Sequence, residues 1–193
     1  MRNNIAIVVL AGGEGKRIGG GKPLKTFRGE RLIDRAVRLA RSWSDSVAIA
    51  IRDRSQLGAV SADLIPDADV AGPLGGLISG MKFAVAGKRQ FVLAIPADMP
   101  FLPEDLIDRL CEAIGDSGCA LAQSGGHIHP VCSLWRADAF AQAESYARSG
   151  RGSLKGLAAC LGFVAVEWQT EPVDPFFNIN TTADLAEAAR RNR

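Results

Sequence analysis

The chain has 193 residues, of which 47% are hydrophobic and 23% are charged. This length suffices for one domain with a substantial core, and the composition is ordinary for a soluble globular protein. The formal net charge is only +2, which excludes a large electrostatic field that would attract nucleic acid or a membrane surface. We therefore expect a single domain over residues 1–193, in which positive charge acts locally.

The apolar residues predict strands and helices in alternation along the chain. Unbroken apolar runs, typical of strands covered on both faces, occur at 5–10, 47–51 and 91–95. Further strands are expected at 63–66, 120–123 and 131–135. Helical spacing of apolar residues predicts helices at 32–43, 74–86, 106–114 and 137–147. The alternation predicts a three-layer α/β/α fold with a mostly parallel sheet, in which ligands bind beyond the carboxyl ends of the strands.

A last helix is expected near the end of the chain. Thr181 can cap its N-terminus, with Asp184 at the third helical position, close to a capping box. This reading explains Thr181 and Asp184 but leaves Asn178 and Asn180, just before them, to be explained separately.

Cysteine usage and the first residues of the chain favour the cytoplasm. Cys111, Cys119, Cys132 and Cys160 have no zinc-ligand spacing and form no CxxC motif, which is typical of free thiols in a reducing compartment. The apolar run at 5–10 is too short for a signal-peptide core or a membrane span. We therefore expect a cytoplasmic protein.

A glycine-rich segment follows the first strand and reads LAGGEGKRIGGGK over residues 10–22. It is not a Walker A loop, because Lys16 stands where a glycine is required and Pro23 follows the final lysine. A dinucleotide fingerprint is also excluded, since Ile18 occupies a glycine or alanine position. Arg17 and Lys22 nevertheless suit the oxygens of a triphosphate. Six glycines and three cations after the first strand favour phosphate binding over a merely flexible, solvated loop.

An acidic residue follows the strand at 91–95. Asp98 lies between Pro96 and Pro100, which would hold it rigidly at the carboxyl edge of the sheet. Mg²⁺ takes one or two carboxylates and completes its coordination with water and substrate phosphate oxygens, so Asp98 suits a magnesium site. Asp67 has a similar location after the strand at 63–66, but spacing does not separate it from Asp69.

An ordered set of motifs carries a family resemblance. The set comprises Leu10-Ala-Gly-Gly-x₃-Arg17-x-Gly-x₂-Lys22, Gly72-Pro-Leu-Gly-Gly76, Pro96-x-Asp98-x-Pro100, His129-Pro130 and Asn178-x-Asn180-Thr181-x₂-Asp184-Leu. Together these motifs resemble the molybdenum cofactor guanylyltransferase family, over nearly the whole chain. The resemblance implies a Rossmann-like nucleotidyltransferase fold and the transfer of GMP from GTP to the terminal phosphate of molybdopterin, with release of pyrophosphate.

The same resemblance implies roles for individual residues. The positions expected to contact the guanine nucleotide are Leu10, Ala11, Gly12, Gly13, Lys22, Asp67 and Asp98. Asp98 would also bind Mg²⁺, Arg17 would lie against the phosphates, and Asn178 and Asn180 match positions on the pterin side. His129 would be structural or on the acceptor side, and its pairing with His127 has neither the spacing nor the companions of a metal site. Other cofactor-assembly proteins and molybdoenzyme chaperones are the implied partners.

The implied reaction is an in-line attack of the acceptor phosphate on the α-phosphorus of GTP. A phosphate nucleophile is already anionic, so no dedicated base is needed, and catalysis would come from positioning and charge neutralisation by Arg17, Lys22 and Asp98.

The chain departs from the family at the second strand. Some members carry an asparagine at the end of that strand, whereas here no polar side chain occurs before Arg52. Two alternatives therefore stay open: a cytidylyl- or other nucleotidyltransferase that acts on a different phosphorylated acceptor, and a non-catalytic nucleotide-binding protein. The Gly12-Gly13 pair resembles guanylyl-transferring members more than cytidylyl-transferring ones.

Overall fold

The computed structural model describes residues 2–11, 24–53, 57–70 and 72–191. These residues contain a seven-stranded sheet with strand order β5-β4-β1-β6-β8-β7-β9 and a small hairpin, β2-β3. The strands of the large sheet are β1 (Ile5–Leu10), β4 (Val47–Ile51), β5 (Asp63–Pro66), β6 (Phe91–Pro96), β7 (Cys119–Ser124), β8 (His127–Arg136) and β9 (Phe163–Trp168). The hairpin pairs β2 (Thr26–Phe27) with β3 (Glu30–Arg31). The helices are α1 (Leu32–Trp43), α2 (Pro73–Ala86), α3 (Leu106–Ala113), α4 (Phe140–Arg148), α5 (Leu154–Leu161) and α6 (Thr182–Arg191), with 3₁₀ turns at Arg2–Asn4 and Ala137–Ala139.

The large sheet is divided into a parallel and a mixed part. Strands β5, β4, β1 and β6 run parallel, so their carboxyl ends meet at one edge. Strand β8 is antiparallel to both β6 and β7, and β9 returns parallel to β7. The prediction of a mostly parallel sheet is thereby confirmed, with β8 as the reversed strand.

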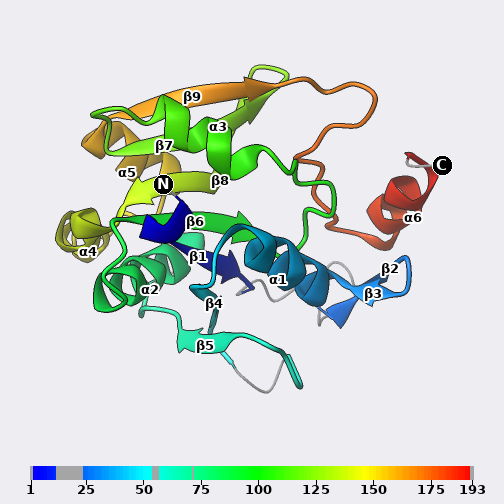
Figure 1. The fold of residues 1–193 in the computed structure, drawn as a ribbon, viewed down its shortest axis with the longest axis horizontal. Helices are drawn as coiled ribbons and strands as arrows, with labels where there is room; N and C mark the ends of the chain where they lie inside the picture. The colour runs from blue at the N-terminus through cyan, green and yellow to red at the C-terminus, as the bar shows by residue number, and fades with distance from the viewer. Residues whose placement is uncertain (1, 12–23, 54–56, 71, 192–193) are drawn as a thin grey trace.

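Helices cover both faces of the sheet, as the three-layer prediction requires (Figure 1). On one face α1 and α3 pack over a cluster that contains Ile7, Ile49 and Leu93. On the other face α2, α4 and α5 pack over Val8, Val92 and Leu121. The alternate residues of each strand therefore serve different layers, because successive side chains of a strand point to opposite faces.

Helix α2 lies very close to the sheet. A Cβ atom on Gly80 would stand 2.7 Å from Val8 Cγ1, so only glycine permits this approach of α2 to β1. The helix is apolar almost all round, which suits an element buried between the sheet and its neighbours. The position of α2 brings its N-terminus to the edge where β5, β4 and β1 end.

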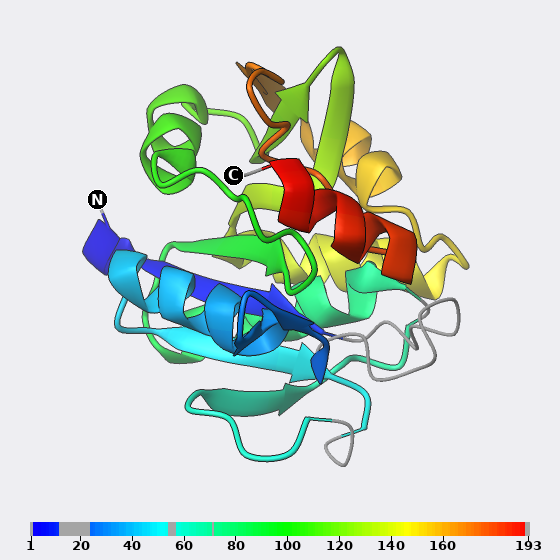
Figure 2. The ribbon, with the colours of Figure 1, turned by 90° about the vertical axis from the view of Figure 1, so that its right-hand side faces the viewer.

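A third cluster joins the end of the chain to the hairpin. Phe27, Leu32, Ile179 and Ala188 are buried together, and α6 lies at the same end of the molecule as β2 and β3 (Figures 1 and 2). The predicted cap of α6 is confirmed: Asp184 N donates to Thr181 Oγ1 over 3.1 Å, and Thr181 N donates to Asp184 Oδ2 over 2.8 Å.

The structure also contains elements that the apolar pattern did not predict. Helix α5 and strand β9 follow α4, and the helix expected at 137–147 begins as the 3₁₀ turn Ala137–Ala139 before α4.

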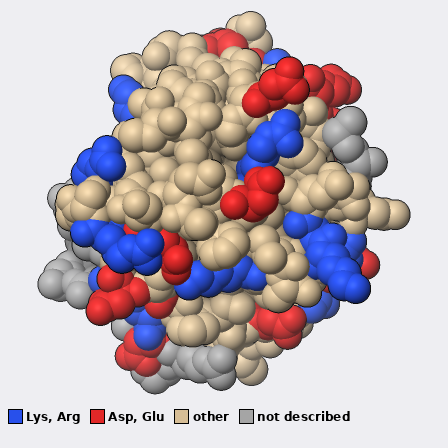
Figure 3. Space-filling model, turned by 90° about the vertical axis from the view of Figure 1, so that its left-hand side faces the viewer, with Lys and Arg blue, Asp and Glu red and all other residues tan. Residues whose placement is uncertain are grey.

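Three of the four cysteines are buried and all four are free thiols. Burial raises the pKa of Cys119 to about 12. Basic and acidic side chains are interleaved on the face shown in Figure 3. Within the described residues, every helix is too short or too polar to cross a bilayer.

Candidate active site

A cavity of about 200 Å³ opens at the carboxyl edge of the parallel strands. Its walls are mostly apolar, and its polar groups come from three segments. The apolar lining includes Leu10, Ala50, Pro73, Pro96 and Val131, and the polar lining consists of Asp67, Asp98 and Asn178. An apolar cavity with a few convergent polar groups is the usual form of a small-molecule site.

The two carboxylates lie at different strand ends. Asp67 directly follows β5, and Asp98 follows β6 with only Ala97 between them. Three strand spacings separate β5 from β6, and at about 4.8 Å per spacing this makes roughly 14 Å across the sheet. Leu10, at the end of β1, stands between them. The cavity can therefore hold a ligand that presents different groups to its two ends.

Asp67 is buried, and one of its oxygens has no protein partner among the described residues. Its side chain is 6% exposed, Oδ2 lies 3.8 Å from Arg52 Nε, and Oδ1 accepts no hydrogen bond from that part of the chain. Burial raises the pKa of Asp67, and the Arg52 charge opposes this shift. A buried polar atom without a partner costs about 1–3 kcal/mol. A ligand that donates to Oδ1 would recover this cost.

Gly76 of α2 makes room for this carboxylate. A Cβ atom at this position would stand 2.7 Å from Leu10 Cδ2 and 3.3 Å from Asp67 Oδ1. Gly76, the last glycine of the Gly72–Gly76 motif, thus leaves space at the floor of the cavity and does not form a turn.

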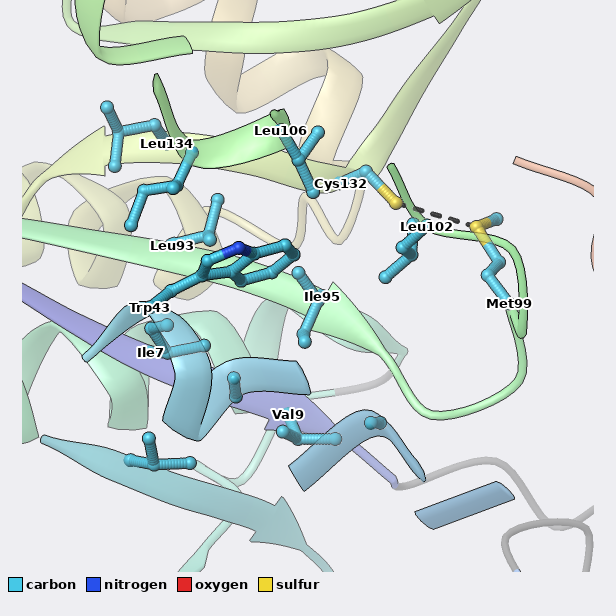
Figure 4. Close-up of a cluster of buried hydrophobic side chains, with 14 of the residues drawn as sticks. Ile7, Val9, Trp43, Leu93, Ile95, Met99, Leu102, Leu106, Cys132 and Leu134 are labelled. Atoms are coloured by element: carbon cyan, nitrogen blue, oxygen red, sulfur yellow. Dashed lines mark hydrogen bonds between the residues drawn. The ribbon is translucent and has the colours of Figure 1, made fainter. Parts of the chain in front are cut away.

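The backbone around Asp98 is fixed on two sides. Its carbonyl oxygen accepts a hydrogen bond from Ile179 N over 3.0 Å, which joins it to the segment that carries Asn178. The next residue, Met99, is buried and its sulfur lies 3.5 Å from Cys132 Sγ (Figure 4). Burial, with the Asp98 charge as a smaller cause, raises the pKa of the Cys132 thiol well above its ordinary value. The thiol stays protonated, and Asp98 is the acidic group that faces the cavity here.

Several predicted site residues are brought together and others are not. Leu10, Asp67, Asp98 and Asn178 all line the cavity. Ala11 is buried beside it, where its N–H donates to Ala50 O over 3.1 Å. Asn180 is exposed at the start of α6, and its backbone N–H donates to Asp184 Oδ2. The remaining predicted residues, Gly12, Gly13, Arg17 and Lys22, lie outside the residues that the structure describes.

The donor set fits magnesium rather than a metal with several protein ligands. Within the described part of the chain, no three His, Cys, Asp or Glu side chains gather as a metal site. Mg²⁺ needs only one or two carboxylates when substrate phosphates and water complete its shell. Asp98 offers one such carboxylate, and Asn178 also lines the cavity.

Sequence reasoning missed a partly buried polar network around Ser124. Ser124 Oγ donates to Asp174 Oδ1 over 3.0 Å and lies 2.8 Å from His129 Nε2. Because the single hydroxyl proton goes to Asp174, the serine oxygen accepts from Nε2–H, which sets the histidine tautomer. Burial lowers the pKa of His129 although Asp174 opposes the shift, and the ring stacks on Phe176 at 4.7 Å. The His129-Pro130 pair was the only signal in the sequence, and it named none of the partners.

Comparisons with known proteins show the family of this chain. The family model of the MobA-like NTP transferase domain matches residues 7–160. A molybdenum cofactor guanylyltransferase of Nitrobacter hamburgensis is 34% identical, with 95% of this chain and 92% of the relative covered. Another, from a Bradyrhizobium species, is 37% identical, with 95% and 91% covered. The chain belongs to the molybdenum cofactor guanylyltransferase family. The resemblance drawn from the motifs is confirmed, and the chain is a nucleotidyltransferase.

Solved structures share this fold, and one of them is a complex with CTP. The molybdopterin-guanine dinucleotide biosynthesis protein A of Archaeoglobus fulgidus superposes with a TM-score of 0.78 at 22% identity, covering 95% of this chain and 96% of its own. A CMP:2-keto-3-deoxy-manno-octonic acid synthetase in complex with CTP superposes with a TM-score of 0.74 at 14% identity, covering 97% of both chains. The Rossmann-like nucleotidyltransferase fold is thereby confirmed. Because a CTP complex shares it, the fold alone does not select the base.

Proposed function

We propose that this guanylyltransferase family member transfers GMP from GTP to the terminal phosphate of molybdopterin and releases pyrophosphate. The observation that carries the proposal is the cavity with Asp67 at one end and Asp98 at the other, across the carboxyl ends of four parallel strands. We further propose that residues 1–193 act as one nucleotidyltransferase domain in the cytoplasm.

The strand order supports one orientation of the nucleotide. The glycine-rich segment follows β1, and Asp98 follows β6, the adjacent strand. Triphosphate and Mg²⁺ therefore belong at this end, with Lys22 and Arg17 from the glycine-rich segment. The base extends along the apolar wall, past Leu10 and Ala50, toward β5 and Asp67. Backbone groups of Leu10, Ala11, Gly12 and Gly13 would contact the nucleotide on the way.

The reaction needs charge neutralisation more than proton transfer. The acceptor phosphate attacks the α-phosphorus in line, a new P–O bond forms, and the bond to the bridging oxygen breaks, so that the electron pair leaves with pyrophosphate. Asp98 would hold Mg²⁺, which when bound offsets negative charge on the phosphate oxygens. Lys22 and Arg17 would stabilise the leaving pyrophosphate. The protonated Cys132 adds no negative charge beside Asp98.

The acceptor molecule would bind on the side of Asp98 that is opposite the base. Asn178 lines the cavity there, and Ile179 is bonded to the Asp98 backbone. We propose that Asn178 and Asn180 face the pterin, and that molybdopterin arrives from, and the product leaves to, other cofactor-assembly proteins or molybdoenzyme chaperones.

Nucleotide competition tests the proposal. Binding of GTP, CTP and ATP to the full chain is measured with Mg²⁺, together with pyrophosphate release in the presence of molybdopterin. We expect GTP to bind tightest and to support turnover. A preference for CTP would instead support the alternative, a cytidylyltransferase with another phosphorylated acceptor. Nucleotide binding with no pyrophosphate release would support a non-catalytic protein.

A further inference from the structure

Arg52 stands directly beside the buried carboxylate of Asp67. The two residues come next in register after the last pairs of β4 and β5, and Asp67 N donates to Ile51 O over 3.1 Å. Arg52 Nη2 donates to Val70 O over 2.8 Å, and Arg52 Nε lies 3.8 Å from Asp67 Oδ2. The guanidinium is therefore held over the loop between β5 and α2, next to the cavity and half exposed.

Asp67 and Arg52 offer a hydrogen-bond acceptor and hydrogen-bond donors side by side. Asp67 presents a buried acceptor oxygen without a protein partner in the described part of the chain. Arg52 has five N–H donors in a planar fork. Within the described residues, one Nη2–H goes to Val70 O and Nε lies near Asp67, which leaves both Nη1–H donors and the second Nη2–H for a ligand. A ligand that satisfies both must carry N–H donors next to an acceptor oxygen.

Guanine carries this pattern along one edge. Its N2 amino group and N1–H are donors, and O6 and N7, which follow them, are acceptors; arginine binds O6 and N7 with two parallel hydrogen bonds in other guanine sites. Adenine reverses the pattern, since it would present an amino group to Arg52 and a lone pair to Asp67. A mismatch of this kind leaves buried polar groups unpaired and is strongly rejected.

We infer that Arg52 and Asp67 together determine guanine specificity, with Asp67 accepting from N1–H and N2–H and Arg52 donating to O6 and N7. This inference rests on the proposed function, because it takes the base to lie at the β5 end of the cavity. Arg52 is the first polar residue after the apolar strand β4, and the inference gives it a role in recognising the base. Backbone groups of the glycine-rich segment do not supply that role.

A cycle of protein and nucleotide changes tests the contact. Binding of GTP, ITP and 6-thio-GTP with Mg²⁺ is measured by calorimetry for the wild-type full chain, Arg52→Gln and Arg52→Lys. ITP lacks the N2 amino group but keeps O6 and N7, whereas 6-thio-GTP replaces O6 by a weak acceptor. Arg148→Gln is the control, because Arg148 is also exposed, lies 3.8 Å from a carboxylate, Glu144, and does not line the cavity.

We expect Arg52→Gln to raise the Kd of GTP and ITP alike, by about 5-fold to 150-fold, the range of one bidentate arginine–guanine pair. The Kd of 6-thio-GTP should rise much less. Arg52→Lys keeps the charge but not the fork, so it should lose the same discrimination, while Arg148→Gln should bind all three nucleotides as the wild type does.

Equal weakening of GTP and 6-thio-GTP in Arg52→Gln would overturn the inference, because the guanidinium would then act as a general positive charge. Unchanged binding in Arg52→Gln, or wild-type discrimination in Arg52→Lys, would overturn it as well. These outcomes leave the proposed function intact as long as the wild type prefers GTP. A wild-type preference for CTP would overturn both.

Discussion

Two carboxylates near the sheet edge have opposite surroundings. Asp174, beside the mixed part of the sheet, accepts hydrogen bonds from Ser124 Oγ and from Phe176 N on the same oxygen, Oδ1. Asp67, at the end of the parallel part, leaves Oδ1 buried without a partner among the described residues. The first arrangement is a closed network that stabilises the fold. The second is costly in the free protein and would be relieved by a ligand that donates to Oδ1, which supports the proposal that the nucleotide binds in the parallel part.

The largest loss of activity should come from a change at Asp98, at the opposite end of the cavity from Asp67. Asp98→Ala removes the proposed magnesium carboxylate, and loss of one such preorganised charge costs about 10²–10³ in rate. We expect this loss in pyrophosphate release, with an unchanged melting temperature, and a comparable loss for Lys22→Ala. Asp69→Ala is the matched control, because Asp69 is exposed and does not line the cavity. Activity near the wild-type level in both Asp98→Ala and Lys22→Ala would refute the assignment of the parallel edge as the active site.

Next in size is a packing change under the parallel part. Gly80→Ala places a Cβ 2.7 Å from Val8 Cγ1, and overpacking of this kind costs about 1–3 kcal/mol. Thermal or urea unfolding should show the loss. Gly87→Ala at the end of α2 meets its nearest atom, Phe83 O, only at 3.4 Å, so its stability should change little. Equal effects of the two substitutions would contradict the close approach of α2 to β1.

Ser124→Ala tests the closed network. The substitution leaves Asp174 and His129 without the hydroxyl that joins them, and we expect a loss of about 1–2 kcal/mol in the free energy of unfolding. Ser42→Ala removes an exposed hydroxyl that donates to Leu39 O and should change stability by less than about 0.5 kcal/mol. GTP binding should be unaffected in both, since the network lies outside the nucleotide end of the cavity. A Ser124→Ala protein as stable as the wild type would remove the contrast between the two carboxylates.

Asp67→Asn should stabilise the folded protein, unlike the substitutions above. Burial raises the folded-state pKa of Asp67, so the folded protein holds the proton more tightly than the unfolded chain does. Wild-type stability therefore falls as the pH rises from the unfolded-state pKa through the folded-state pKa, and the penalty persists above it. The neutral amide avoids this penalty, so the variant should be more stable than the wild type at pH 7, while GTP binding weakens. Urea titrations at several pH values measure the difference.

That advantage of Asp67→Asn should disappear below the ordinary pKa of an aspartate, where both proteins are neutral at this position. A destabilised variant at pH 7, or a difference that does not depend on pH, would show that Asp67 is satisfied in the free protein.

All four strands of the parallel part were predicted from the sequence, whereas in the mixed part β7 and β8 were predicted and β9 was not. Apolar runs identify β1, β4 and β6 directly, because strands covered on both faces show no alternation. Asp98 could then be placed at a strand end. The Ser124–Asp174 contact joins residues 50 positions apart, and no local pattern encodes such a pair. Strand β9 reads FVAVEW, so its apolar run was present in the sequence although its residues are alternately exposed and partly buried at the sheet edge.

Spacing also failed to separate Asp67 from Asp69, and only burial did so. Asp67 lines the cavity, whereas Asp69 is exposed. The deciding factor is the N-terminus of α2, where Gly76 leaves space beside Asp67. Such a contact depends on tertiary packing, which sequence distance does not report.

The smallest effect on stability should come from a surface ion pair that does not line the cavity. Lys82 Nζ lies 2.5 Å from Glu144 Oε1, with side chains 52% and 28% exposed, and this pairing lowers the pKa of Glu144. Exposed pairs contribute little because water and salt screen them and two long side chains lose freedom. Lys82→Ala should therefore shift Tm by less than about 2 °C, with the shift smaller still at high salt. A shift as large as that of Gly80→Ala would mean that α4 is held to α2 by charge rather than by the buried contacts of Ala143 and Tyr146.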